Sequence, residues 1–131
     1  MRRLMLLLVA AALVLPLTVQ AQTPATPSSV KVMKAGDASL LATASNGMTL
    51  YVYDPDTAGK ATCNGPCATN WPPLAADASA KPVGKYTIVT RDDGSLQWAY
   101  DGKPLYGWKN DKAPGDMTGD GVGGKWHVAR P

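Results

Sequence analysis

The chain repeats itself at an offset of 55 residues, and this repeat constrains its fold more than any other feature. Residues 46–56 align without a gap with residues 101–111. A glycine, a leucine, a tyrosine, a second aromatic residue and an aspartate recur at matching positions. The same offset carries Trp71 onto Trp126. The sequence therefore predicts two copies of one structural unit.

The size of the repeat indicates how the copies are arranged. A unit of about 55 residues buries only about 60% of the surface that its unfolded chain exposes, so one copy alone would be marginally stable. The offset also carries Leu41 onto Leu96, which extends the expected register beyond the motif. We expect the copies, about residues 30–77 and 85–131, to pack into one small pseudo-symmetric domain.

Turn signals and composition predict a mainly β fold, a β-meander in each copy. Asn-Gly or Asp-Gly dipeptides occur at residues 46–47, 93–94 and 101–102 and are typical of tight hairpins. All ten acidic residues are aspartate, which favours turns, and glutamate, a good helix former, is absent. We expect strands at 86–91, 95–100 and 103–108, a closing strand at 125–129, and a short helix at 65–71.

Strand alternation predicts two different faces in the motif strand. Successive side chains of a strand point to opposite sides of the sheet. Met48, Leu50 and Val52 would therefore form an aliphatic face, and Tyr51 and Tyr53 an aromatic one. By the same rule, Leu96, Trp98 and Tyr100 share a face, where aromatic pairs across strands are expected.

The N-terminal residues predict export. Residues 1–21 read as a signal peptide, with a basic start, an apolar run too short to span a bilayer, and a small-x-small site that ends at Ala21. A polar, proline-containing leader at 22–29 is expected to be disordered, and residues 30–131 form the single β-domain. The chain should therefore be periplasmic or secreted, with no stable membrane insertion after cleavage.

Charge argues against nucleic acid as a partner. The chain has 13 basic and 10 acidic residues, and removal of the signal peptide takes away Arg2 and Arg3. The remaining 110 residues carry 11 basic residues and no basic stripe, so there is no electrostatic surface for nucleic acid.

Cys63 and Cys67 are the only cysteines. In an exported protein the first expectation is a disulfide, which would close a five-residue loop worth roughly 2 kcal/mol in the chain-entropy model. A reversible dithiol and a soft-metal site are the alternatives, since two thiolates can bind Cu(I) or Zn(II). His127, the only histidine, could complete a copper set, although a position on the surface of the last strand is the simpler interpretation.

The other polar clusters favour structural roles. Asp111, Asp116 and Asp120 lie in a glycine-rich loop that lacks the EF-hand pattern, so turn formation is preferred to calcium binding. Asp56 recurs as Asp111, and we expect both to cap the turn after the motif strand. No nucleophile elbow, phosphate loop or metal-binding histidine pair is present, and we expect no enzymatic activity and no cofactor.

The aromatic residues of the repeat have two open interpretations. The chain has no phenylalanine, so every aromatic ring carries a polar group. Such rings suit a half-hydrated core, which is the preferred interpretation, or a surface for a flat or sugar-like ligand. The residues concerned are Tyr51, Tyr53, Trp71, Trp98, Tyr106, Trp108 and Trp126.

With these motifs, the chain resembles a bacterial family of secreted repeats of unknown function, described as predicted lipoproteins with a Tyr-x-aromatic-x-x-Asp motif. Residues 51–56 and 106–111 both fit that motif, and the similarity extends from about Asp37 to Pro131 through residues 63–68, 71–74, 114–116 and 126–128. The resemblance implies location and architecture more than chemistry. No lipid-attachment cysteine follows the apolar run, so the lipoprotein label does not carry over.

The sequence thus leads to one main hypothesis and one alternative, with an undetected hydrolase as a third. The main hypothesis is a non-catalytic envelope module that binds a partner protein, a surface polymer or a small ligand. The alternative is a periplasmic copper-binding or thiol-redox protein that uses Cys63, Cys67 and His127.

Overall fold

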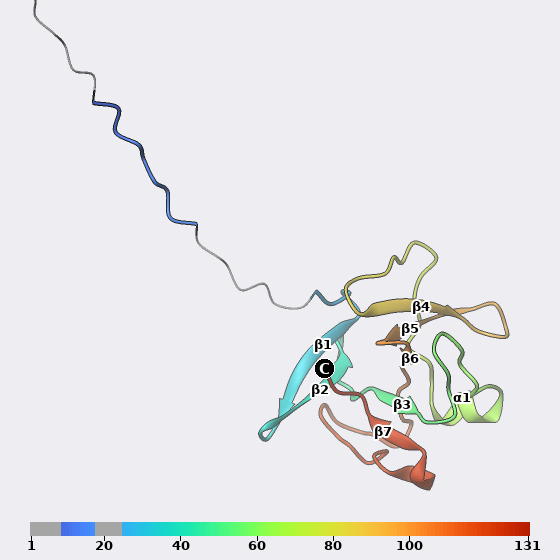
Figure 1. Ribbon diagram of the computed structural model, residues 1–131. Helices are drawn as coiled ribbons and strands as arrows, with labels where there is room; N and C mark the ends of the chain where they lie inside the picture. The colour runs from blue at the N-terminus through green and yellow to red at the C-terminus, as the bar shows by residue number, and fades with distance from the viewer. Residues whose placement is uncertain (1–8, 18–24) are drawn as a thin grey trace, which may run out of the picture.

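The computed structural model describes residues 9–17 and 25–131, and the folded part is built mainly from short strands (Figure 1). The strands are β1 (Val30–Ala35), β2 (Ala38–Thr43), β3 (Tyr51–Tyr53), β4 (Tyr86–Thr90), β5 (Leu96–Tyr100), β6 (Lys103–Pro104) and β7 (Trp126–Val128). The helices are α1 (Pro66–Asn70) and the 3-10 helix η1 (Val122–Gly124). The predicted mainly β fold is confirmed, as are the closing strand and the short helix.

The strands form three small antiparallel sheets. β1 pairs with β2, β4–β5–β6 form a meander, and β3 pairs with β7. The third strand of the meander is shorter than the predicted 103–108, because Tyr106 leaves β5 and pairs with Tyr51 instead. The predicted Asp-Gly hairpin at 101–102 is present, with φ of 50° at Asp101 and 80° at Gly102.

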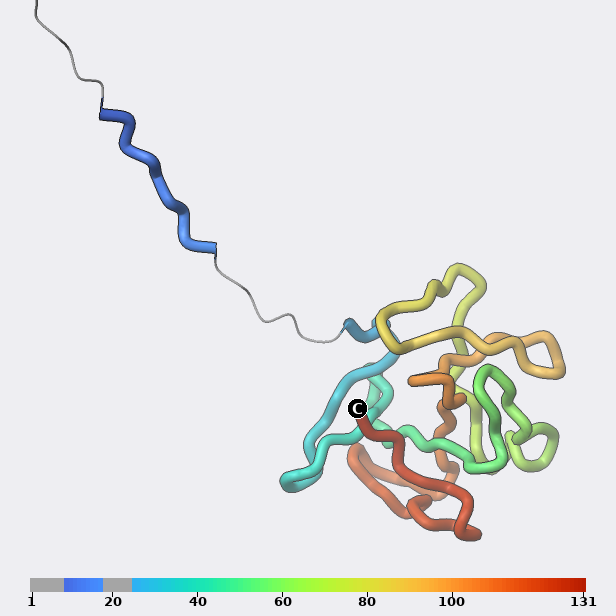
Figure 2. Tube along the Cα trace, viewed as in Figure 1, coloured from blue at the N-terminus to red at the C-terminus, as the bar shows by residue number. Residues whose placement is uncertain are grey.

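The two copies are related by a pseudo-two-fold arrangement centred on the motif tyrosines. The Tyr51 amide donates to the Tyr106 carbonyl at 2.8 Å, and the Tyr106 amide donates to the Tyr51 carbonyl at 3.0 Å. Motif strand β3 of the first copy pairs with β7 of the second, and Tyr106 of the second copy pairs with Pro73 of the first. Figure 2 shows the red C-terminal segment returning beside the earlier part of the chain. Each copy therefore completes the other.

The expected equivalence of Leu41 and Leu96 is wrong. Leu41 and Trp98 occupy equivalent positions instead. Their amides donate to the equivalent carbonyls of Ala129 and Leu74, respectively, in the other copy. Their carbonyls accept from the amides of the motif leucines, Leu50 and Leu105. The cause is a difference in hairpin loops. Residues 44–47 connect Thr43 to Met48, whereas only residues 101–102 connect β5 to β6. The two additional residues shift the register of the preceding strands.

The core consists of two clusters on opposite faces of the motif strand, as alternation predicts. Tyr51 belongs to the first cluster with the stacked aromatic rings, whereas Leu50 belongs to the second with Trp98 and Tyr86. The rings of Tyr86 and Tyr100 lie directly across β4 and β5, with centroids 4.9 Å apart. The expected aromatic pairing across strands is therefore present.

The N-terminal segment lies partly outside the described residues. Residues 1–8 and 18–24 of the expected signal peptide and leader fall there. Within the leader, which was expected to be disordered, Pro27 is buried and the Ser29 carbonyl accepts a hydrogen bond from the Ala44 amide. Residues 25–29 thus pack against the domain. Among the described residues, no helix has the length and apolar character needed to cross a bilayer.

Candidate functional site

Four aromatic rings from the two copies form one continuous stack. In order, Tyr53, Trp126, Trp71 and Trp108 have centroid separations of 4.3, 3.8 and 3.9 Å. The two central indoles are nearly parallel, at an interplanar angle of 3°. Each copy contributes alternating members through the exchanged strands, so the stack joins the copies.

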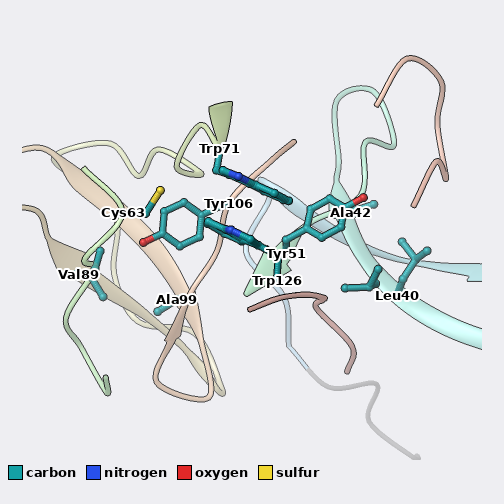
Figure 3. Close-up of a cluster of buried hydrophobic side chains, with 11 residues drawn as sticks. Leu40, Ala42, Tyr51, Cys63, Trp71, Val89, Ala99, Tyr106 and Trp126 are labelled. Carbon is teal, nitrogen blue, oxygen red and sulfur yellow. The ribbon is translucent and has the colours of Figure 1, made fainter. Parts of the chain in front are cut away.

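The motif tyrosines close the stack from its sides, as Figure 3 shows for the two central indoles. Tyr51 packs edge-on against Trp71, and Tyr106 packs edge-on against Trp126. Both tyrosines are fully buried, and the two tryptophans are 4–5% exposed. These repeated aromatic residues therefore form core, and only the half-buried ends of the stack, Tyr53 and Trp108, reach the surface.

Each motif tyrosine donates a hydrogen bond to the motif aspartate of the other copy. Tyr51 Oη lies 2.6 Å from Asp111 Oδ2, and Tyr106 Oη lies 2.7 Å from Asp56 Oδ2. The second oxygen of each aspartate accepts from a threonine amide and hydroxyl, at Thr118 for Asp111 and at Thr62 for Asp56. The aspartates are thus structural, but they link the copies and do not simply cap the following turn.

This environment shifts the acid–base behaviour of the tyrosines. Burial raises the pKa of Tyr51 above its ordinary value, and the hydrogen bond to Asp111 raises it further. Burial and the bond to Asp56 raise the pKa of Tyr106 in the same way, while nearby Arg91 acts in the opposite direction. Both hydroxyls therefore hold their protons in the folded state at a pH at which free tyrosine ionises.

The raised pKa values predict a loss of stability in alkali. Because the folded pKa lies above the unfolded value of about 10, the unfolded state loses protons first, so the free energy of unfolding should fall as pH rises above about 10. Urea titrations between about pH 9 and pH 12 measure this slope. The double variant Tyr51→Phe/Tyr106→Phe should have a shallower slope, and an equal slope in both proteins would contradict the assignment.

Cys63 and Cys67 form the expected disulfide, with sulfurs 2.05 Å apart. Cys63 is 1% exposed, whereas Cys67 is half-buried. The buried Arg91 guanidinium fixes this loop by donating to the Cys63 carbonyl at 2.7 Å and to Asn64 Oδ1 at 2.9 Å. Arg91 also donates to Gln97 Oε1 at 2.6 Å. Sequence reasoning missed this arginine, because nothing in the hairpin sequence signals burial.

The aspartates of the glycine-rich loop have protein partners. Asp116 accepts from the amides of Lys112 and Ala113, and Asp120 accepts from the Val128 amide. These carboxylates thus satisfy backbone donors of the loop and of β7, which agrees with the structural role expected for them. Among residues 9–17 and 25–131, no three His, Cys, Asp or Glu side chains gather as a set of metal ligands.

Two surface grooves lie at equivalent places in the two halves of the domain. Their volumes are about 450 and 300 Å³. The 55-residue offset carries seven residues of one groove onto seven of the other, and Tyr100 corresponds to Thr43 in the register of Leu41 and Trp98, so the repeat generates both grooves. The larger groove is lined by Val52, Asp54, Tyr100, Asp101, Lys103, His127, Val128 and Ala129 at these positions, together with Lys85, Arg130 and Pro131. Its counterparts in the smaller groove are Gly107, Lys109, Thr43, Asn46, Met48, Pro72, Pro73 and Leu74.

The larger groove, which we term the charged groove, contains a hydrogen-bonded histidine and aspartate from neighbouring strands. His127 Nε2 lies 2.8 Å from Asp54 Oδ2, and both side chains are about half exposed. β3 and β7 create this geometry, since Val52 lies opposite His127 and the Asp54 amide donates to the Lys125 carbonyl. The groove thus presents an imidazole and a carboxylate beside other charged side chains.

The smaller groove, which we term the neutral groove, lacks most of these charged side chains, and Lys109 is its one charged lining residue in the described part of the chain. Proline stands at the position of His127, methionine at that of Lys103, and asparagine at that of Asp101. Thr49 Oγ1 and Trp108 Nε1, both from residues that line this groove, are buried without a hydrogen-bond partner among the described residues.

His127 lies at the surface of the last strand, as predicted, but its contact with Asp54 was not predicted. The positions of Lys85 and Lys103 in the same groove were not predicted either. The sequence did contain a signal for these residues. The two copies differ at the positions of His127, Lys103 and Asp54, and such differences mark the residues that are particular to one groove.

The comparisons with known proteins agree with the internal repeat. No curated protein and no solved structure matches the chain. A family model described as a secreted repeat of unknown function matches twice, at residues 34–75 and 87–130. These matches cover most of the chain and coincide with the two halves that exchange strands. The chain therefore belongs to this family of secreted repeats.

Proposed function

We propose that the chain is a non-catalytic, exported module of the bacterial envelope, periplasmic or secreted, that binds a ligand in the charged groove. The observation that carries this proposal is the difference between two equivalent grooves. The tyrosines and aspartates that link the copies recur in both halves, whereas the exposed charged side chains of the larger groove do not. The charges of Asp54, His127 and Lys103 have no counterpart of the same kind in the neutral groove.

The chemistry of the groove favours a ligand that carries charges of both signs. Lys85, Lys103 and His127 offer hydrogen-bond donors for carboxylates or phosphates, while Asp54 and Asp101 accept from amines. An open groove of this kind suits a flexible peptide or polymer segment more than an enclosed small molecule. An envelope polymer with peptide branches, or an exposed segment of a partner protein, has this composition.

The test is an amide chemical-shift titration with three soluble probes: a disaccharide-tetrapeptide fragment of peptidoglycan, dextran sulfate and a neutral chito-oligosaccharide. We expect saturable shifts around Asp54, His127 and Lys103 with the disaccharide-tetrapeptide. The variant Asp54→Asn/His127→Ala should weaken this binding at least about tenfold, a loss consistent with removal of charge-assisted hydrogen bonds.

The repeat supplies a matched control. Lys109→Ala alters the neutral groove at the position equivalent to Asp54 and should leave the affinity unchanged. No saturable shift with any of the three probes, or shifts confined to the neutral groove, would reject the charged groove as the binding site.

The copper or thiol-redox alternative keeps one supporting observation, which is that Cys67 is only half-buried, whereas its partner Cys63 is buried. Free thiols are counted before and after mild reductant, and the reduced protein is titrated with Cu(I). Ready reduction and one-to-one copper binding that weakens in His127→Ala would support this alternative. A bond that resists mild reduction and the absence of stoichiometric binding would reject it.

A further inference from the structure

The two outer strands of the domain, β1 and β4, are equivalent in the repeat. Each stands at the end of its sheet, and Val32 of β1 lies opposite Leu41 as Ile88 of β4 lies opposite Trp98. Because Leu41 and Trp98 are equivalent, their partners Val32 and Ile88 are equivalent too. β1 therefore aligns with β4 at the offset between those partners, which is 56 residues. The two edges can therefore be compared position by position.

The outer edge of β4 presents free backbone groups. Tyr86 exchanges hydrogen bonds with Val83 on the side away from β5, and the Arg91 amide donates toward β5 at Ser95. Bonding alternates along an antiparallel strand, so the amides and carbonyls of Ile88 and Thr90 point away from β5, like those of Tyr86. Within residues 25–131, these groups have no backbone partner beyond the sheet.

The two edges differ in the feature that prevents pairing with another chain. β1 carries exposed Lys31 and Lys34, and lysines on an edge strand are a common device against association. At the equivalent positions β4 carries Thr87 and Thr90, which are also exposed. The sequence of β4, Tyr-Thr-Ile-Val-Thr, has high β propensity and no charge. The fold thus protects one edge and leaves its counterpart open.

We propose that β4 pairs with β4 of a second copy of this chain, in antiparallel orientation about a two-fold axis at Val89. This register places Ile88 opposite Thr90 of the second copy and supplies four backbone hydrogen bonds. The two three-stranded sheets then join into one of six strands. The exposed threonines of this edge, Thr87 and Thr90, line neither groove, although Lys85 at the start of the strand also lines the charged groove.

Charge complementarity argues for a second copy over an unrelated peptide. Exposed Lys85 precedes the strand, and exposed Asp93 follows it in the hairpin loop. In the antiparallel register about Val89, Lys85 at one end of each strand lies beside the turn of the other copy that carries exposed Asp92 and Asp93, while the buried Arg91 is held within its own domain. The exposed charges at the two ends of β4 are therefore complementary, and the strand between them is neutral. An isologous contact of this kind closes as a dimer and does not propagate.

The experiment is sedimentation velocity of the full mature domain from micromolar to millimolar concentration, combined with hydrogen exchange of the Ile88 and Thr90 amides. We expect a reversible monomer–dimer equilibrium, with exchange at these two amides slowing as concentration rises. The variant Thr87→Lys/Thr90→Lys places lysines on β4 at the positions equivalent to those of β1. It should raise the dissociation constant of the dimer at least about tenfold.

Thr57→Lys/Thr69→Lys is the matched control, because it adds the same charge at exposed threonines away from the edge. It should leave the equilibrium unchanged, and far-ultraviolet circular dichroism checks that both variants fold. A wild-type chain that stays monomeric at millimolar concentration overturns the proposal. So does a dimer that both variants weaken equally, or one in which exchange at Ile88 and Thr90 is independent of concentration.

Discussion

Trp126→Ala should remove about 3 to 5 kcal/mol from the free energy of unfolding, the range for truncation of a buried aromatic side chain to alanine. Trp126 contacts Tyr53, Trp71 and Tyr106, so its loss opens a cavity where the two copies meet. A domain of this size has about 5 to 15 kcal/mol in total. Urea unfolding followed by far-ultraviolet circular dichroism measures the loss.

The neighbouring residue on the same strand is the control. His127→Ala changes an exposed side chain of β7 and should alter the free energy of unfolding by less than about 0.5 kcal/mol. Trp71→Ala should cost as much as Trp126→Ala, and the double variant should cost less than the sum, because the two indoles stack on each other. A loss below about 1 kcal/mol for Trp126→Ala would show that the stack does not hold the copies together.

Asp111→Ala should be the most damaging change of a polar residue, with an expected loss of about 3 kcal/mol or more. The carboxylate is 7% exposed and accepts from the Tyr51 hydroxyl and from the amide and hydroxyl of Thr118. Its removal leaves the fully buried Tyr51 hydroxyl with only the Asp116 carbonyl, at 3.5 Å, as an acceptor among the residues that the structure describes. Thermal and urea unfolding both report the change.

The repeat again provides the comparison. Asp56→Ala removes the equivalent carboxylate, but Asp56 is half-buried, so water can replace part of what is lost, and the expected effect is smaller. Asp111→Asn should recover part of the stability, since an amide oxygen can still accept from Thr118. Equal losses for Asp56→Ala and Asp111→Ala would indicate that burial does not determine the strength of these links.

The sequence was sufficient for those features that depend on local pattern. Alternation in residues 48–53 placed Leu50 and Tyr51 on different faces, and the Asp-Gly pair at 101–102 predicted its hairpin. The identity of the repeated residues also predicted one pseudo-symmetric domain. Each of these inferences needs only neighbouring residues or a comparison of the chain with itself.

The features that escaped prediction depend on contacts between distant segments. Arg91 is buried because it meets the disulfide loop 28 residues earlier in the chain, and no local signal reports that contact. Nothing in the glycine-rich loop distinguishes Gly119 from the turn glycines beside it. In the structure, however, a Cβ atom on Gly119 would lie 2.9 Å from both Trp71 and Tyr51, so the packing of these rings requires glycine there. The pair of Asp54 and His127, 73 residues apart, exists only because β3 lies beside β7.

The exchange of strands between the copies also sets an order in time. β3 cannot find its partner until β7, about 75 residues later, has been made, and contacts so distant in sequence form slowly. A chain whose synthesis stops before residue 126 lacks one indole of the stack and the strand that pairs with the first motif. The two halves should therefore complete one another only after residues 126–128 have been made, so the first half depends for its sheet on the second.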